Sequence, residues 1–294
     1  MTWRLTLLLT CLALATSRVG LVAHELVGHG GVALACGGNI TQVKLFWFAG
    51  GWIRYDGVDG PCRALAVTLG GMAVEVLIGA VLWAVVRGDS LGHRLVRGIG
   101  AAAMIHAGFY FAAGAWHGYG DGALLYHDLG DARYPVAIVA GLLVCAMTFI
   151  GARWIAGAIA AAAPRWGMIV ALVAAAGINI GLDVGELAVR TDRTYSATMA
   201  HENERIVARE LAQIERDTPL APDQRALVRE RLEDENREFP FRWLLAAGVV
   251  IGFSLGVWRS PRRERFAVPD RLLARAAAVA LASLAVVIAL SVVM

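Results

Sequence analysis

Seven long runs of apolar residues constrain this chain more than any other feature of its sequence. An α-helix needs about 17–25 mostly apolar residues to cross roughly 30 Å of hydrocarbon. Runs of this kind cover residues 5–34, 63–86, 98–117, 134–153, 166–189, 241–258 and 271–293. Hydrophobic residues make up 58% of the chain, a share typical of membrane proteins. The sequence therefore predicts an all-α polytopic membrane protein with about seven transmembrane helices.

The first run begins in the manner of a secretory signal peptide. The segment MTWRLTLLLTCLALATS has a short basic start and an apolar middle, as signal peptides do. The apolar pattern continues through RVGLVAHELVGHGGVALA, however, so cleavage near Ser17 would leave half a span. We therefore expect the first run to be retained as a helix.

The loop after the first run is expected to form a small membrane-associated β-hairpin. Its segments ITQVKLFWF and GWIRYD are rich in β-branched and aromatic residues, and AGG joins them. This pattern is typical of two antiparallel strands, which we place within residues 39–56. Such a hairpin offers an unpaired edge to which an extended peptide can add as a further strand.

A polar segment, residues 190–240, interrupts the apolar runs. It contains the charged stretches HENERIVARELAQIERD and APDQRALVRERLEDENREF, in which apolar residues recur at helical spacing, and TPLAP separates them. This pattern predicts a helical hairpin outside the membrane. The segment is either a solvated linker or an element that controls substrate access or binds a partner.

Arginine collects in alternate loops and so predicts the orientation. The densest block is RSPRRERF, between the last two runs, and other arginines lie within residues 87–97 and 153–165. Because cytoplasmic loops carry the excess of Arg and Lys, we expect these loops and the N-terminus inside. The segments expected outside are residues 36–62, 117–133 and 190–240.

The net charge of +3 is spread along the chain and forms no basic stripe, so nucleic acid is not expected as a partner. The expected surroundings are the lipid bilayer and another membrane protein. We expect an integral, multi-pass protein of the cell membrane of a bacterium.

The stretch LVAHELVGHGG, in the first run, places His24 and His29 five residues apart. An α-helix turns about 100° per residue, so residues five apart point roughly 140° away from each other. A π-bulge, with i→i+5 hydrogen bonds, would return both histidines to one face. Gly28, between them, makes the backbone tolerant of that change. A shared metal ion here therefore requires a locally widened helix at residues 24–29.

The motif HELVGHG resembles the H-E-x-x-G-H motif of the dipeptidyl peptidase III family, where two histidines five apart hold zinc. The order of elements over about residues 1–130 resembles the site-2 protease family of intramembrane zinc metalloproteases. In that family a helix with HELGH precedes a β-hairpin, a helix with a Gly-rich start, and a helix with an Asp-Gly ligand. Here HELVGHG, the hairpin, LGGMAVEVLIG and FAAGAWHGYGDGALL follow in that order. The chain departs in the extra residue of its first motif and in lacking the Asn-Pro that usually precedes Asp-Gly.

The resemblance implies a zinc-dependent endopeptidase that cuts a peptide bond in or near a transmembrane segment of a membrane protein. Carried over residue by residue, it implies His24, His29 and Asp121 as Zn²⁺ ligands and Glu25 as the general base. Three protein ligands and a water are usual for catalytic zinc, and a nearby carboxylate can accept the proton of that water. The protease-like core would cover residues 1–133. The remaining parts would be two helices in 134–189, the polar segment 190–240, and two helices in 241–294.

Several other polar residues have more than one interpretation. Glu75 lies mid-run, where no turn explains a charge, so it could orient a histidine or the substrate, or replace Asp121 as a ligand. His106, His117 and His127 are ordinary interfacial histidines, or one of them lines the site.

Two acidic residues near the end of the fifth run, Asp183 and Glu186, are expected to face water or Arg190, or else to form part of a functional path. The residues of the first motif could instead join helices or line an ion pathway, and Asp121 could be part of a simple turn. The alternative function is therefore a non-hydrolytic membrane scaffold, metal-binding or transport protein on the same fold.

Overall fold

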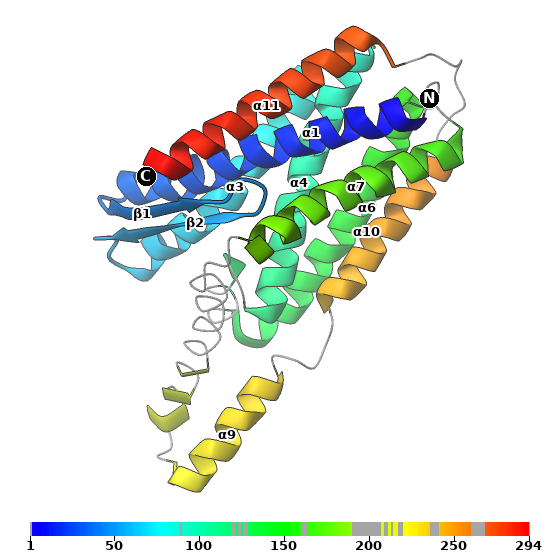
Figure 1. The fold of residues 1–294 in the computed structure, drawn as a ribbon. Coiled ribbons are helices and arrows are strands. Elements are labelled where there is room, and N and C mark those ends of the chain that lie inside the picture. Colours follow the sequence, from blue (N-terminus) through cyan, green and yellow to red (C-terminus); the bar gives the residue numbers. More distant parts are fainter. Residues whose placement is uncertain are drawn as a thin grey trace.

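Among the residues that it describes, a computed structural model of the chain contains seven helices that are long and apolar enough to cross a membrane (Figure 1). The structure describes residues 2–88, 90–118, 121–122, 125, 129–159, 164–189, 207–208, 211–212, 214–216, 220–235, 241–259 and 268–293. The first span is continuous through α1 (Thr2–Val22), the π-helix η1 (Ala23–Gly30) and α2 (Gly31–Ala35). The other spans are α3 (Pro61–Val85), α4 (Leu91–His117), α6 (Arg133–Ile159), α7 (Arg165–Val189), α10 (Phe241–Trp258) and α11 (Asp270–Val293). The predicted fold class is confirmed: the chain is a multi-pass membrane protein.

The outer surface of these helices is apolar. Leu142, Val173 and Leu281 are 65%, 67% and 66% exposed, as suits side chains that face hydrocarbon and not water. Between helices, small residues allow close approach. A Cβ on Gly79 of α3, for example, would lie 2.5 Å from the carbonyl oxygen of Gly100 of α4, so these two backbones meet directly.

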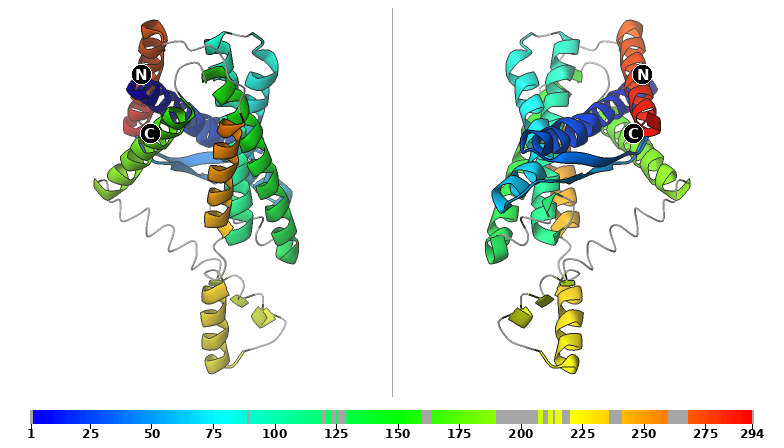
Figure 2. Two further views of the ribbon diagram at one scale, coloured as in Figure 1. Left: turned by 90° about the vertical axis from the view of Figure 1, so that its right-hand side faces the viewer. Right: turned by 90° about the vertical axis from the view of Figure 1, so that its left-hand side faces the viewer.

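The spans form two crossing layers. In one layer α1 lies between α7 and α11, and in the other α3, α4, α6 and α10 pack side by side in that order. Figure 2 shows the first layer inclined to the second. Leu5 and Leu8 of α1 and Met168 of α7 belong to a core between the layers. Because α3 also packs against η1, the layers meet at the motif that carries the histidines.

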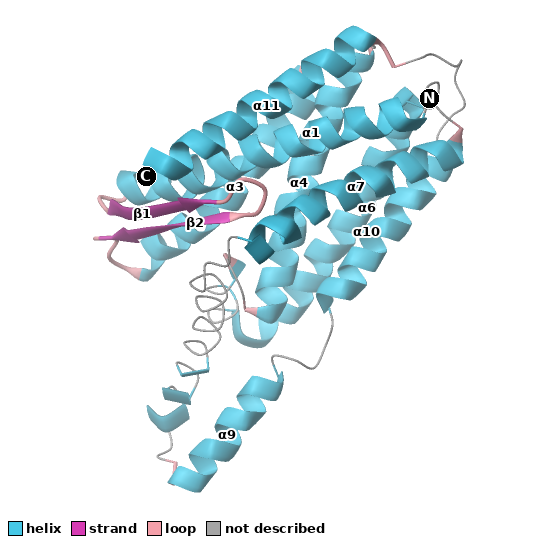
Figure 3. Ribbon diagram, viewed as in Figure 1, coloured by secondary structure: helices cyan, strands magenta, loops and turns pink. Residues whose placement is uncertain are grey.

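A two-stranded antiparallel sheet follows the first span, as predicted. Strands β1 (Asn39–Leu45) and β2 (Gly51–Asp56) pair from Asn39↔Asp56 to Leu45↔Gly51, with an irregularity near Ile40. Figure 3 shows the hairpin beside the helices at one end of the bundle. Val43 and Leu45 pack against Val287 of α11, so the hairpin is anchored to the last span.

The turn between the strands is held by a buried arginine. The guanidinium of Arg18, on α1, donates hydrogen bonds to the carbonyl oxygens of residues 46–49 at 2.6 to 3.0 Å. Arg18 is only 3% exposed. Water cannot reach the carbonyl groups of a buried turn, so these groups need hydrogen-bond donors from the protein. One planar guanidinium with five N–H donors satisfies four of them.

Glu186 of α7 holds the opposite side of the same turn. Its carboxylate accepts hydrogen bonds from the backbone N–H groups of Trp47 at 2.7 Å, of Ala49 at 3.0 Å, and of Phe48. The expectation that Glu186 faces water is therefore wrong: the side chain is buried, because the turn needs acceptors for its N–H groups. Arg190, the other expected neighbour, lies outside the described residues. Trp47 also donates from its indole to Ser291 Oγ at 3.1 Å. The hairpin thus joins α1, α7 and α11.

Parts of the polar segment 190–240 lie outside the described residues. Within the described part, α9 (Pro222–Glu235) is helical, and Figures 1 and 2 show it apart from the bundle. Arg225 of α9 forms an ion pair with Glu215 at 3.1 Å. The described part thus includes one of the two helices expected in this segment.

The Glu186 carboxylate can be tested by removing its charge. Glu186→Gln presents an amide N–H to backbone N–H groups and leaves Arg18 without its buried carboxylate. Removing one member of a buried pair typically costs about 3–5 kcal/mol. We expect a lower melting temperature and faster amide hydrogen exchange at residues 46–49.

The matched control is Asp183→Asn, one turn earlier on α7. Asp183 is half-buried, and no hydrogen bond joins it to the turn in the part of the chain that the structure describes. Equal effects of the two substitutions would show that charge near Arg18, and not hydrogen bonding to the turn, holds the hairpin.

Candidate metal centre

The helix is widened at the motif HELVGHG, as a shared metal site requires. Residues Ala23–Gly30 form a π-helix of 8 residues, within a run of helix that continues on both sides. The i→i+5 hydrogen bonding turns His24 and His29 to the same face. Val27 is 59% exposed, so the extra residue bulges outward and the two histidines point inward.

Three side chains converge on this face. Nε2 of His24 lies 3.1 Å from Nε2 of His29 and 2.9 Å from Oδ2 of Asp121. Nε2 of His29 lies 3.1 Å from Oδ1 of Asp121. Each of the three offers one ligand atom, and these atoms all lie within 4.8 Å of one another. Residues nearly a hundred positions apart therefore form one compact donor set.

The surroundings decide which nitrogen of each ring faces the cluster. Nδ1 of His29 lies 2.7 Å from the carbonyl oxygen of Val67, an acceptor only, so Nδ1 carries the proton and donates. Nδ1 of His24 faces Oε1 of Glu75 at 3.4 Å, again an acceptor, in an electrostatic contact that is not aligned as a hydrogen bond. Both Nε2 atoms therefore turn lone pairs toward each other and toward a carboxylate. Such an arrangement requires positive charge between the groups, supplied by a metal ion or by protons.

Glycine allows α3 to approach the histidines. A Cβ on Gly28 would lie 2.5 Å from Cα of Gly71, so η1 and α3 touch backbone to backbone. A Cβ on Gly71 would lie 2.6 Å from Nε2 of His24 and 2.7 Å from Nε2 of His29. The Gly-rich start of α3 thus leaves the room that the donor set occupies.

Asp121 reaches the cluster because α4 ends abruptly. Gly118, directly after α4, has φ +70°, a left-handed conformation that ends helices and that glycine adopts without strain. A Cβ on Gly122 would lie 2.0 Å from the carbonyl carbon of Gly114, so the chain folds back tightly onto α4.

Glu25 and Glu75 are the two buried carboxylic acids near His24. Glu25, next to His24 in η1, is buried at 6% exposure. Glu75 of α3 faces Nδ1 of His24, the nitrogen turned away from the donor set. This position suits a carboxylate that orients a ligand histidine and does not suit an alternative ligand to the same ion. Sequence reasoning had left both roles of Glu75 open.

The remaining histidines separate into two groups. His106 of α4 is within hydrogen-bond distance of Glu75, with Nδ1 3.0 Å from Oε2, and its ring stacks on Tyr110. His117 instead accepts a hydrogen bond from the backbone N–H of Arg242, at the start of α10, so it is not part of the donor set. His127 lies outside the described residues.

Sequence reasoning missed two residues around the site. Arg18 was not distinguished from other arginines, although an arginine inside an apolar run is itself a signal of function or of a buried partner. Tyr55 of β2 makes a hydrogen bond to Thr68 of α3, but burial dominates and raises its pKa. These contacts place the hairpin close to the start of α3, and hence to the histidines.

The donor set fits a divalent transition metal. Two imidazole nitrogens and a carboxylate oxygen are ordinary zinc ligands, and ligands of a tetrahedral ion at about 2.1 Å lie roughly 3.4 Å apart. The separations of 2.9 to 3.1 Å are close to this value. Oδ2 of Asp121 is buried and has no hydrogen-bond partner within the described structure, which a metal ion would satisfy.

Comparison of the chain with protein-family models, with curated proteins and with solved structures found no significant match.

The close approach of α3 generates a prediction. Gly71→Ala places a methyl group against both ligand nitrogens, so the rings must move apart and zinc affinity should fall by roughly 10–100-fold. Metal analysis of the purified protein, with a competing chelator, measures this. The control is Gly177→Ala on α7, where a Cβ meets nothing within 4 Å. Unchanged zinc affinity in Gly71→Ala would contradict the geometry of the site.

Proposed function

We propose that the chain is a zinc-dependent intramembrane endopeptidase, similar to the site-2 protease family. The observation that carries the proposal is the meeting of two Nε2 lone pairs and the Asp121 carboxylate on the widened face of η1, with Glu25 beside them. An acid next to a buried donor set inside a transmembrane helix is costly to maintain. Hydrolysis of a peptide bond gives each of these residues a use.

In the proposed reaction His24, His29 and Asp121 hold Zn²⁺. When bound, the ion supplies a water of lowered pKa and polarises the peptide carbonyl. Glu25 accepts the proton of the attacking water and returns it to the leaving amine. Glu75, facing Nδ1 of His24, would favour the tautomer of His24 that leaves Nε2 able to bind a metal.

The proposed substrate is a membrane protein cut in or near a transmembrane segment. A helix must unwind before its peptide bond is accessible, and the hairpin offers a place for the unwound segment. Within the described residues each strand of the two-stranded sheet pairs with only one neighbour, so a third strand can add by backbone hydrogen bonds. We place the protein in the cell membrane of a bacterium.

A second function is favoured by one observation. The series Asp121, His24, Glu75 and His106 runs from the buried cluster to a side chain that is 67% exposed. Such a chain of titratable groups inside a membrane is also typical of ion or proton pathways. The alternative is therefore a metal-binding or transport protein without hydrolytic activity.

Metal content tests the ligand assignments. The purified protein should carry about one zinc per chain, and Asp121→Ala should abolish binding. Glu75→Gln should weaken it only about 10–100-fold, as loss of an orienting carboxylate does. Equal losses in the two variants would show that Glu75 is itself a ligand.

The general base separates the two functions. Glu25→Gln should lower cleavage about 10²–10⁴-fold while zinc content stays equal to that of the parent protein. The assay uses a library of single-span peptides in micelles, read by mass spectrometry, with a chelator-treated sample as blank. The control variant is Asp131→Asn, on an exposed turn. Chelator-insensitive cleavage, or none in the zinc-loaded parent protein, would favour the alternative.

A further inference from the structure

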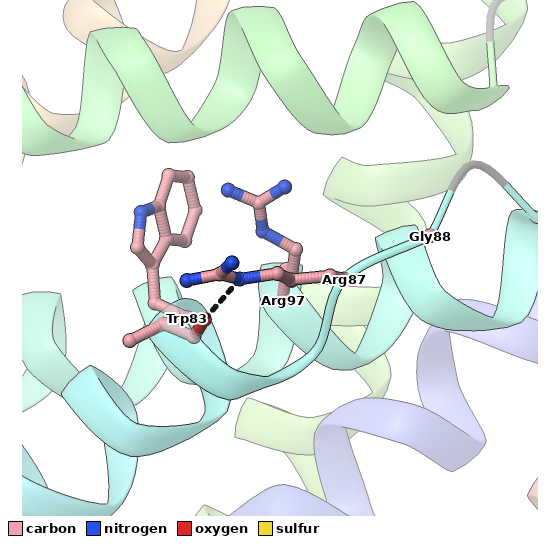
Figure 4. Close-up of a pocket in the computed structure, with 5 residues that line it drawn as sticks. Trp83, Arg87, Gly88 and Arg97 are labelled. Atoms are coloured by element: carbon pink, nitrogen blue, oxygen red, sulfur yellow. Dashed lines mark hydrogen bonds between the residues drawn. The ribbon is translucent and has the colours of Figure 1, made fainter.

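A pocket of about 450 Å³ lies between the end of α3 and the start of α4, and it is lined by Trp83, Ala84, Arg87, Gly88 and Arg97. Its volume is within the roughly 300–1,000 Å³ usual for ligand sites. Figure 4 shows the guanidinium groups of Arg87 and Arg97 beside the indole of Trp83. The pocket thus brings two positive charges and an aromatic ring to one place.

Arg97 is held in position by aromatic side chains. Its guanidinium carbon lies 4.7 Å from the ring centroid of Trp83 and 4.8 Å from that of Trp154 on α6. These contacts stabilise the cation through the faces of the aromatic rings. The N–H groups at the edge of the guanidinium plane remain able to donate hydrogen bonds to a ligand. Arg97 Nε is buried and has no hydrogen-bond partner in the part of the chain that the structure describes.

Neither arginine of the pocket has an acidic partner among the described residues. Arg87 donates one hydrogen bond, to the carbonyl oxygen of Ala84 at 3.4 Å. Two guanidinium groups placed together repel each other, and an anion between them would remove this cost. The planar, forked donors of arginine match the oxygens of a phosphate group.

The position of the pocket in the bundle favours a lipid headgroup as the anion. The pocket lies at the end of the helices opposite to the hairpin, where Arg4 of α1 pairs with Asp270 of α11. Tryptophan is enriched at membrane interfaces, and basic pockets between transmembrane helices on the cytoplasmic side bind anionic lipid headgroups. The arginine distribution of the sequence predicts that this end faces the cytoplasm.

We propose that this pocket binds the phosphate of an anionic phospholipid headgroup, with Arg87 and Arg97 as its ligands. This site is separate from the donor set, which lies toward the hairpin end, and does not depend on any proteolytic activity. Its ligand joins α3 and α4, the two helices that carry Glu75 and lead to Asp121. A bound lipid would therefore stabilise the packing of α3 against α4, the helices that position Glu75 and Asp121.

Native mass spectrometry of the full chain in micelles tests the proposal, with phosphatidylglycerol and phosphatidylcholine as probes. The parent protein should bind phosphatidylglycerol at least about tenfold more tightly. The double variant Arg87→Gln, Arg97→Gln should lose this preference, and Arg87→Gln alone, at an exposed side chain, should weaken it about fivefold. Unchanged preference in Arg87→Gln would overturn the assignment even if the double variant does not fold.

Two control variants separate this pocket from general electrostatics. Arg54, on the hairpin, lies over Trp52 at 4.9 Å, so Arg54→Gln breaks an Arg–Trp pair at the opposite end. Arg271→Gln removes an exposed charge near the pocket's end of the bundle. Both should keep the lipid preference, and an equal loss in either would overturn a specific site. Competition by inorganic phosphate as strong as by the lipid would show that the pocket takes free phosphate and not a headgroup.

Discussion

The i→i+5 hydrogen bonding of η1 is the constraint on which the rest of the candidate site depends. In a regular α-helix His24 and His29 would point to different neighbours, and no approach by α3 or Asp121 could bring them to one ion. With the helix widened, both rings face the same way, and Gly71 lets α3 close over them. Burying two imidazoles without polar partners would cost more free energy than widening the helix does. The π-helix is therefore stable only because polar partners surround the two rings.

The second requirement is that polar backbone inside a membrane protein must find partners within the protein. The hairpin turn meets it with two ionised side chains from different helices: Arg18 supplies donors and Glu186 supplies acceptors. Because these side chains neutralise each other across the turn, neither leaves an uncompensated buried charge. The arrangement keeps the strands against α11 and near the histidines, where an extended substrate would have to lie.

Much of the fold could be predicted from local patterns. The seven spans and the hairpin follow from apolar length and from β-branched composition, and both were recovered close to their observed bounds. The widened helix could be stated as a condition, since the spacing of His24 and His29 demands it. The role of Glu186 could not be predicted from the sequence. An acidic residue near the end of a span is as compatible with a place in water as with a place in a buried turn, and only the tertiary contact distinguishes the two.

The sequence by itself determined the seven spans, the alternation of arginine between loops, and the residue types able to hold a metal ion. These are properties of local length, charge and spacing. Only the tertiary structure decided that Asp121 joins His24 and His29, that Glu75 faces the far nitrogen of His24, and that His117, at the end of α4, accepts a hydrogen bond from the backbone of α10. Such pairings depend on how helices far apart in the chain pack, and a single sequence carries no direct record of which faces will meet.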